Sequence, residues 1–426
     1  MASCKRINEI KINLIIIKME NRIDTMAAKS EMLLRYCAIV YLFVALYYFM
    51  ILPKFSGDEP VFIADLHLIH DSGWYDALVK NISIPYMLLV YPFSFIMEDY
   101  IALRIVNVGL VVLLLLYFYY VSKFKFNSFY SYLLFFISTV GYFYYGTNDC
   151  LIFVSMIVFF NEVHRAVNKK DVNFNLALTA LVIAFFTREL FLVYLPVVFL
   201  GLYILFTSGC KFSTKTFIPV GLVLFFVILN IPSIQKNGTL SYDRKTPPRE
   251  FHVTWPQRNY LSQLRVNEGT LKNGQHVGWQ ETQDYLDANG KDSLPVGNIE
   301  GIILDWKLTM TEFFKDFATT IVNSFRSLGF MLLLSMLYWF HQSKKNKIID
   351  FKYFVPFSTL VMMMIFSFII ICFPDLRWLS PVFVMTLVYY SELHEHKSIS
   401  KYFILANTLV LCVFSVYGIV RIFMKL

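Results

Sequence analysis

Two adjacent carboxylates, Asp58 and Glu59, follow the first long apolar run, residues 33–52, within a few positions. A carboxylate at the edge of a bilayer is costly unless it lines a wet cavity or meets a partner, so acids kept there are candidates for function. Partial desolvation raises the pKa of such a carboxylate and makes it a better general base. The alternative interpretation is a hydrophilic stop that marks the end of a membrane span.

Three arginines at the ends of other apolar runs are candidates for binding an anion. Arg188 lies in the turn between two closely spaced runs, Arg377 lies just before the run at 378–393, and Arg104 lies near the start of a run. A guanidinium group pairs with phosphate in bidentate fashion better than an ammonium group does. Pairing of Arg188 with Glu189, of Arg377 with Asp375, or of either arginine with lipid headgroups explains the same positions.

The remaining candidates for chemistry are weaker. Asp149 stands at a helix entrance, where an acidic side chain ordinarily caps the helix. His67 and His70 are three residues apart and could share a helix face, but the sequence positions no third metal ligand and Asp65 would have to be recruited. We therefore predict no metal site, although assistance by a divalent metal stays open.

The composition identifies the elements that must hold these residues. Of the 426 residues, 57% are hydrophobic and 18% are aromatic, which exceeds the roughly 45 to 50% apolar content of soluble domains. Much of the excess of basic residues behind the formal charge of +8 is clustered between apolar runs, where it orients helices rather than binds nucleic acid. The six cysteines are scattered and form no disulfide framework. The sequence predicts an all-α polytopic membrane protein.

Apolar runs near the length of a bilayer crossing predict about 11 transmembrane helices, within a range of 10 to 13. The expected runs are 33–52, 100–121, 129–146, 149–164, 174–188, 190–208, 216–232, 317–341, 353–373, 378–393 and 400–422. The run at 84–97 is short and contains Pro85 and Pro92, so it is interpreted as interfacial or re-entrant. If it does not cross, the basic clusters between the later runs fall on the side of the basic N-terminus, as the positive-inside rule requires.

This orientation divides the chain into four parts. Residues 1–30 form a basic cytoplasmic tail, and 31–232 form an N-terminal transmembrane module whose first outer loop, 53–99, carries the two acids. Residues 233–316 form a loop-rich extracytoplasmic cap, and 317–426 form the C-terminal transmembrane helices. The candidate acids and arginines then gather on the outer face.

The order of these motifs resembles the GT-C superfamily of membrane glycosyltransferases. An N-terminal helix, an Asp-Glu pair in the first outer loop and a Gly-Trp-Tyr and proline-containing juxtamembrane stretch come first. Ala102-Leu103-Arg104, Gly146-Thr147-Asn148-Asp149 and Thr187-Arg188-Glu189 follow. The resemblance covers roughly residues 33–210. It is closest to bacterial members related to protein mannosyltransferases and to the lipid A aminoarabinose transferase.

The resemblance implies a GT-C-like bundle and transfer of a sugar from a polyprenyl-phosphate donor to a cell-surface or lipid-linked glycan. It implies Asp58 as the catalytic base and Glu59 as the second choice. Members of the aminoarabinose type have a further acid just before the juxtamembrane proline, and none precedes Pro85 here. A second acid must therefore be Glu59, Asp65 or Asp149.

Carried over in the same way, three arginines are expected to contact the donor phosphate, and no cofactor is expected. Aromatic side chains of the cap could stack on the acceptor sugar, although packing of the cap explains them as well. The arginines are Arg104, Arg188 and Arg377, and the aromatic residues are Trp255, Tyr260 and Trp279, with Tyr285 nearby.

The resemblance places the protein in the inner membrane of a bacterium with its active site on the extracytoplasmic face. Modification of O-antigen, as by serotype-converting glucosyltransferases, would suit one large outer loop. An O-antigen polymerase or ligase is the alternative among enzymes. A lipid-linked glycan flippase or transporter is the alternative outside enzymes, but charges within the apolar runs are sparse and no internal repeat is apparent.

Overall fold

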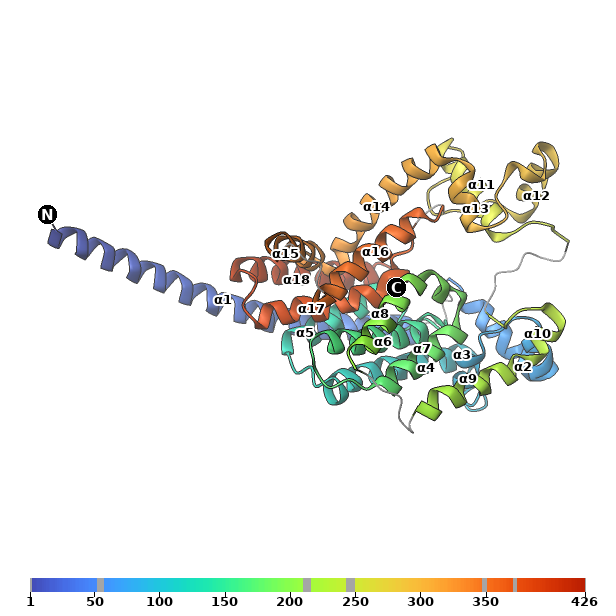
Figure 1. The fold of residues 1–426 in the computed structure, drawn as a ribbon, viewed down its shortest axis with the longest axis horizontal. Coiled ribbons are helices and arrows are strands. Elements are labelled where there is room, and N and C mark those ends of the chain that lie inside the picture. The colour runs from blue at the N-terminus through green and yellow to red at the C-terminus, as the bar shows by residue number, and fades with distance from the viewer. Residues whose placement is uncertain are drawn as a thin grey trace.

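The computed structural model describes residues 2–51, 57–209, 216–242, 250–346, 351–370 and 374–425. Within these ranges the chain consists of helices and connecting segments, with no strand, which confirms the all-α class (Figure 1). Residues 53–56 of the expected outer loop and Pro247-Pro248 of the expected cap lie outside the described residues.

Five helices are long and apolar enough to cross a membrane, and up to seven spans result if each of two bent pairs counts as one, within the described ranges. The five candidates are Arg22–Met50 within α1 (Ala2–Ile51), Asp99–Val121 (α4, Asp99–Leu116, with η1, Tyr117–Val121), α6 (Asp149–Val167), Glu189–Thr207 (η2, Glu189–Tyr194, with α8, Leu195–Thr207) and α18 (Lys401–Phe423). The bent pairs are α9 (Phe217–Leu229) with α10 (Ile231–Asn237), and α14 (Trp306–Leu328) with α15 (Met331–Asn346).

The other expected runs coincide with shorter helices, which is why the expected count of about 11 is not confirmed. A helix of 14 residues is about 21 Å long at 1.5 Å per residue, whereas the hydrocarbon core is about 30 Å thick. These helices are α5 (Asn127–Val140), α7 (Phe174–Thr187), α16 (Phe354–Phe368), which follows η5 (Phe351–Tyr353), and α17 (Ser380–Glu395), which follows η6 (Leu376–Leu379).

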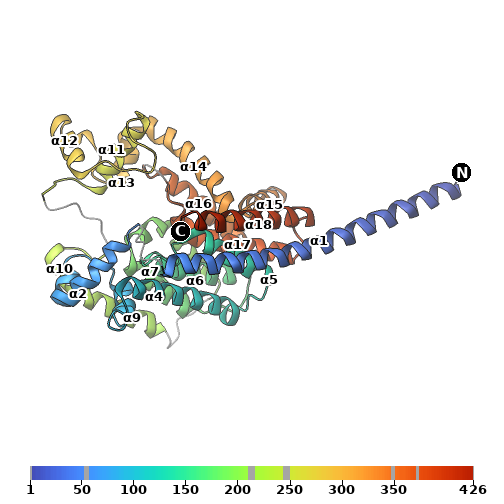
Figure 2. The same cartoon turned by 180° about the vertical axis from the view of Figure 1, so that it is seen from behind.

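Helix α6 is the centre of the bundle. Its apolar window is 94% buried, and α4, α7, α8 and α17 pack around it. Helix α1 packs against α5 and α18 through its C-terminal half, while its N-terminal half extends away from the bundle (Figures 1 and 2). Residues 2–30, expected to form a basic tail, thus continue the first apolar helix.

The expected outer loop folds into two helices that lie at the end of the molecule opposite the N-terminus. Pro60 begins the first turn of α2 (Glu59–Val79), and Phe62, Leu66 and Ile69 form its buried face at helical spacing. Helix α3 (Ile84–Val90) has seven residues, or about 10 Å. It is too short to cross a bilayer, in agreement with the interpretation of residues 84–97.

The expected cap is more helical than its composition suggests. It contains α11 (Trp255–Asn267), α12 (Trp279–Asn289), η4 (Lys291–Ser293) and α13 (Asn298–Leu304) around a small apolar core of its own. A capping box between Thr254 and Gln257 begins α11. Helices of 7 to 13 residues span only two to four turns, so their periodicity is hard to see in the sequence.

The expected single run at 317–341 is wrong, because the chain bends by 114° between α14 and α15. Gly329 ends α14 with φ 55° and ψ −133°, which a residue with a side chain rarely adopts. A Cβ atom there would overlap Oδ1 of Asn407, and that oxygen accepts a hydrogen bond from the amide of Phe330 at 2.7 Å. Asn407 of α18 thus satisfies an amide that the bend exposes.

Candidate active site

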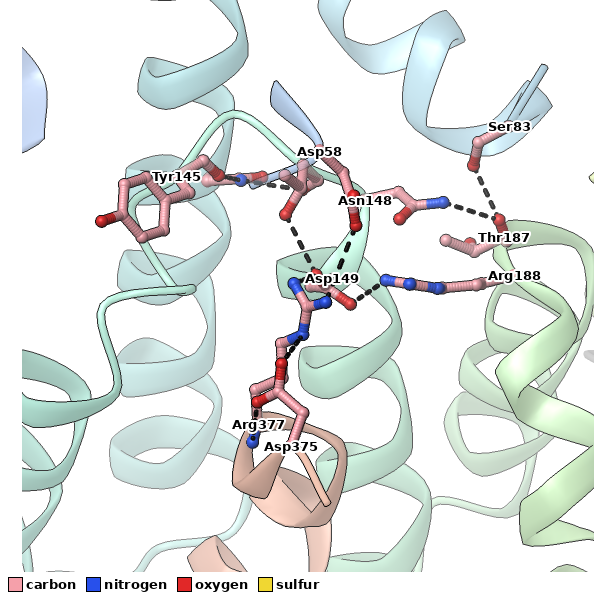
Figure 3. Close-up of polar contacts among 11 residues, drawn as sticks. Asp58, Ser83, Tyr145, Asn148, Asp149, Thr187, Arg188, Asp375 and Arg377 are labelled. Atoms are coloured by element: carbon pink, nitrogen blue, oxygen red, sulfur yellow. Dashed lines mark hydrogen bonds and ion pairs between the residues drawn. The ribbon is translucent and has the colours of Figure 1, made fainter. Parts of the chain in front are cut away.

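Seven charged side chains from five segments meet at the end of the bundle opposite the N-terminus, and Figure 3 labels five of them. We call them the ion cluster. Several are placed by helix starts: Asp58 is the N-terminal capping position of α2, Asp149 is the first residue of α6, and Arg377 lies in η6 before α17. The members are Asp58, Glu59, Arg104, Asp149, Arg188, Asp375 and Arg377.

Arg377 is the centre of the ion cluster. Its Nε lies 2.7 Å from Oδ2 of Asp375, its Nη1 lies 3.2 Å from Oδ2 of Asp149, and its Nη2 lies 3.7 Å from Oδ2 of Asp58. The ring of Tyr142 lies under the guanidinium, 4.1 Å from its centroid to Cζ. One cation thus contacts three carboxylates and an aromatic face.

Asp149 contacts both Arg188 and Arg377. Its Oδ1 accepts from Nη1 of Arg188, and its Oδ2 contacts both Arg377 and the hydroxyl of Thr147, the latter at 3.3 Å. The Asp149 side chain is fully buried, whereas 13% of the Arg188 side chain is exposed. Asp149 therefore positions the two guanidinium groups and is itself shielded from solvent.

Glu59 and Arg104 form a separate buried pair within the ion cluster. Arg104 donates from Nε to Oε1 of Glu59 at 2.6 Å and from Nη2 to Oε2 at 2.7 Å. The amide of Gly146 also donates to Oε1, at 2.9 Å. Because Glu59 is 0% exposed and Arg104 only 1%, this pair fixes the start of α2 against α4.

Backbone contacts hold the surrounding segments in register. The carbonyl of Thr187, next to Arg188, accepts from the hydroxyl of Ser83 at 2.7 Å and from Nδ2 of Asn148 at 3.1 Å (Figure 3). Asn107 of α4 donates to the carbonyls of Tyr145 and Thr147. These contacts link α3, α4, α6 and α7 directly beneath the carboxylates.

The charges in the ion cluster do not balance. Four carboxylates face three guanidinium groups, which leaves one formal negative charge in excess. Glu59 is matched by Arg104 and Asp149 by Arg188, while Asp375 is the nearest partner of Arg377. Asp58 lies 3.7 Å from Arg377 and its side chain is 13% exposed, so it can be reached from solvent. Asp375 is 32% exposed but lies closer to Arg377, at 2.7 Å, and the side chains of Glu59 and Asp149 are fully buried.

Burial affects the ionisation of the loop residues around Arg377. It raises the pKa of Asp375, although Arg377 opposes the shift, and it raises the pKa of Tyr142 to about 12. For Arg377 burial acts to lower the pKa, but Asp149 and Asp375 outweigh it and the pKa lies above its usual value. Arg377 therefore stays charged at any pH at which the protein works.

The other acids and histidines named from the sequence lie outside these contacts. Asp65 is half-buried on α2, two turns beyond Asp58. His67 pairs with Asp99 at 2.9 Å, and His70 contacts the hydroxyl of Ser94 at 2.9 Å. No group of three or more His, Cys, Asp or Glu side chains is arranged to hold a metal among the described residues.

The cap residues expected to bind an acceptor are already in contact with protein groups. The guanidinium of Arg258 stacks over Trp255 and Trp279, with Cζ at 4.9 Å and 4.5 Å from the two ring centroids. Tyr260 is 4% exposed in the apolar core of the cap. Trp255 and Trp279 are half-buried, so part of each ring still faces outward.

Sequence reasoning missed Tyr142 and Asn107. Asn107 had a signal, because a polar side chain one turn after Arg104 in an apolar helix faces the same buried side. No sequence signal marks Tyr142, because its ring contacts Arg377, which lies 235 positions further along the chain.

Comparison of the chain with protein-family models, with curated proteins and with solved structures found no match.

Proposed function

We propose that the chain is an integral-membrane glycosyltransferase of the GT-C type, with Asp58 as its general base. It would take one sugar from a polyprenyl-phosphate donor and add it to a cell-surface glycan or its lipid-linked precursor. The observation that carries the proposal is the position of Asp58, a partly exposed carboxylate at the start of α2 that lies 3.7 Å from Arg377 in the same ion cluster as the partly exposed Arg188. The motif order that resembles GT-C enzymes supports it as well.

The proposed step is a single displacement. Asp58 accepts the proton of an acceptor hydroxyl while that oxygen forms a bond to the anomeric carbon. The bond from the anomeric carbon to the donor phosphate oxygen breaks, and the polyprenyl phosphate leaves with the electron pair. Guanidinium groups stabilise the negative charge that develops on the leaving phosphate.

Arg188 is the donor-phosphate contact that the proposal favours. Its Nη1 contacts Asp149, and its side chain is partly exposed at the surface of the ion cluster. Arg377 has the role of orienting Asp58 and adding positive potential. Arg104 and Glu59, which engage each other through two hydrogen bonds, have a structural role in the proposal and no contact with substrate.

The finer topology also belongs to the proposal. We propose that the chain crosses the membrane about 11 times, with the shorter helices completing the bundle. We also propose that it lies in the inner membrane of a bacterium, with the ion cluster on the extracytoplasmic face. The cap would contact the acceptor through the outward surfaces of Trp255 and Trp279. In support, α2, α10 and the cap helices gather at the same end of the molecule (Figures 1 and 2).

Mass spectrometry of surface glycans from cells with and without the gene tests the proposal. We expect deletion to remove a single hexose or pentose from the repeating unit and the wild-type gene to restore it. Loss of glycan polymer with every sugar retained would instead indicate a polymerase or ligase. An unchanged glycan with an accumulated lipid-linked precursor would indicate a flippase. Either result would contradict sugar transfer.

A further inference from the structure

The C-terminal ends of four helices, α1, α5, α14 and α18, surround a cavity of about 360 Å³ next to the ion cluster. Its polar lining is strongly basic: Arg326 lies in the last turn of α14, Arg421 in the last turn of α18, and Lys425 directly after it. Arg377 and Asp375 form the wall shared with the ion cluster. These five charged residues give the cavity a formal charge of +3, from four cations and one carboxylate.

Two of these cations contact no acid. Among the described residues, neither Arg326 nor Arg421 lies within ion-pair distance of a carboxylate, and Arg326 instead stacks over Tyr417 with Cζ 5.4 Å from the ring centroid. Charged side chains on membrane helices ordinarily face the bundle interior or a water-filled cavity, and pair with one another or with backbone carbonyls. The lining of the cavity therefore supplies no carboxylate partner for Arg326 or Arg421, and a bound anion would supply one.

Compensation of helix dipoles offers a simpler role for these arginines. A cation in the last turn of a helix contributes about 0.3–1 kcal/mol by that effect. Dipole compensation does not require cations from α14, α18 and η6 to converge on one space. It also does not account for the aromatic walls that Tyr48, Phe49 and Tyr142 provide.

We propose that this cavity binds the phosphate of a phosphate ester, held by Arg326, Arg421 and Lys425. Guanidinium groups match phosphate oxygens in bidentate geometry, and two of them with an ammonium group more than neutralise the charge of about −2 on a phosphomonoester. The aromatic walls suit an ester with an apolar substituent, so a lipid phosphate and free phosphate are the two sources to separate. The site is distinct from Arg188, and its occupancy requires no sugar transfer.

Binding to the full-length protein in nanodiscs tests the proposal without turnover. The probes are farnesyl phosphate, farnesol and inorganic phosphate, each titrated against the wild type, Arg326→Gln and Arg421→Gln. We expect farnesyl phosphate to bind and each substitution to weaken it about tenfold, as loss of a charge-assisted hydrogen bond predicts. Arg421→Lys, which keeps the charge but loses the bidentate geometry, should weaken binding less than Arg421→Gln does. Lys345→Gln, which removes an exposed cation from α15, is the matched control and should bind as the wild type does.

The two sources give different results. Much tighter binding of farnesyl phosphate than of inorganic phosphate would identify a lipid phosphate as the ligand. Equal affinities for the two probes would identify free phosphate. Either result supports the site if the arginine substitutions weaken binding. Binding of farnesol as tight as that of its phosphate would overturn the proposal. Equal binding by the wild type and Arg421→Gln would overturn it too, as would binding of neither phosphate. An inactive Asp58→Asn that still binds farnesyl phosphate would separate this site from the proposed reaction.

Discussion

Arg377 contacts three carboxylates at once, and this arrangement gives Asp58 and Glu59 different environments although they are adjacent in the chain. Asp58 lies at 3.7 Å from a guanidinium that two other acids share. Glu59 is fully buried and forms two hydrogen bonds with Arg104. In the proposed reaction Asp58 exchanges a proton with the acceptor, whereas Glu59, which is fully buried, has a structural role.

The sequence points to the members of the ion cluster and to one of its pairings, that of Arg377 with Asp375, which lie 2.7 Å apart. Asp58, Asp149, Arg188 and Arg377 were all singled out, because acids and arginines at the ends of apolar runs are exceptional. The other pairings could not be predicted, because the ion pair between Glu59 and Arg104 spans 45 positions and that between Asp149 and Arg377 spans 228.

Glu59→Gln should lower stability more than a surface change does. Removing one partner of a buried ion pair costs about 3–5 kcal/mol, because the remaining Arg104 is left buried without a counter-charge. The measurement is the midpoint of thermal unfolding in detergent. Adding Arg104→Gln should recover part of the loss, since the two residues are coupled.

Glu268→Gln is the matched control, because its ion pair with Arg265 is exposed and worth about 0–1 kcal/mol. A Glu59→Gln variant as stable as this control, with sugar transfer abolished, would show that Glu59 acts in catalysis and that our structural assignment is wrong.

At the scale of elements, hydropathy located the helices but not their lengths or bends. Apolar runs predicted helices at α4, α6 and α18 because their side chains are lipophilic all round. The bend at Gly329 was missed because the flanking residues are apolar on both sides. Its cause lies in α18, where Asn407 contacts the bend from 77 positions away.

Gly329→Ala tests the origin of this bend. Alanine at this position would have to adopt a positive φ, and its methyl group would overlap Oδ1 of Asn407. We therefore expect the free energy of unfolding to fall by at least about 1–3 kcal/mol. Gly109→Ala in α4 is the control, because its Cβ would meet open space in regular helix and should be neutral or slightly stabilising. Equal melting midpoints for the two variants would mean that the bend does not depend on glycine.

At the scale of the whole molecule, segments from the first loop, the centre and the C-terminal third converge at one end of the bundle (Figure 1). The positive-inside rule grouped these segments on one face, and the contacts between Asp58, Asp149, Arg188 and Arg377 bring them together. The packing of the cap could not be predicted, because no sequence pattern indicates that the Arg258 guanidinium stacks over both Trp255 and Trp279.

Sugar transfer by purified protein in proteoliposomes, with a synthetic polyprenyl-phosphate sugar as donor, tests the role of Asp58 most directly. Asp58→Asn keeps the shape of the side chain and removes the base, so we predict a loss of at least about 100-fold in rate, as expected for loss of general base catalysis. The unfolding midpoint should remain near that of the wild type. Asp71→Asn, an exposed acid on the same helix, should transfer sugar at the wild-type rate. Wild-type activity in Asp58→Asn would contradict the account.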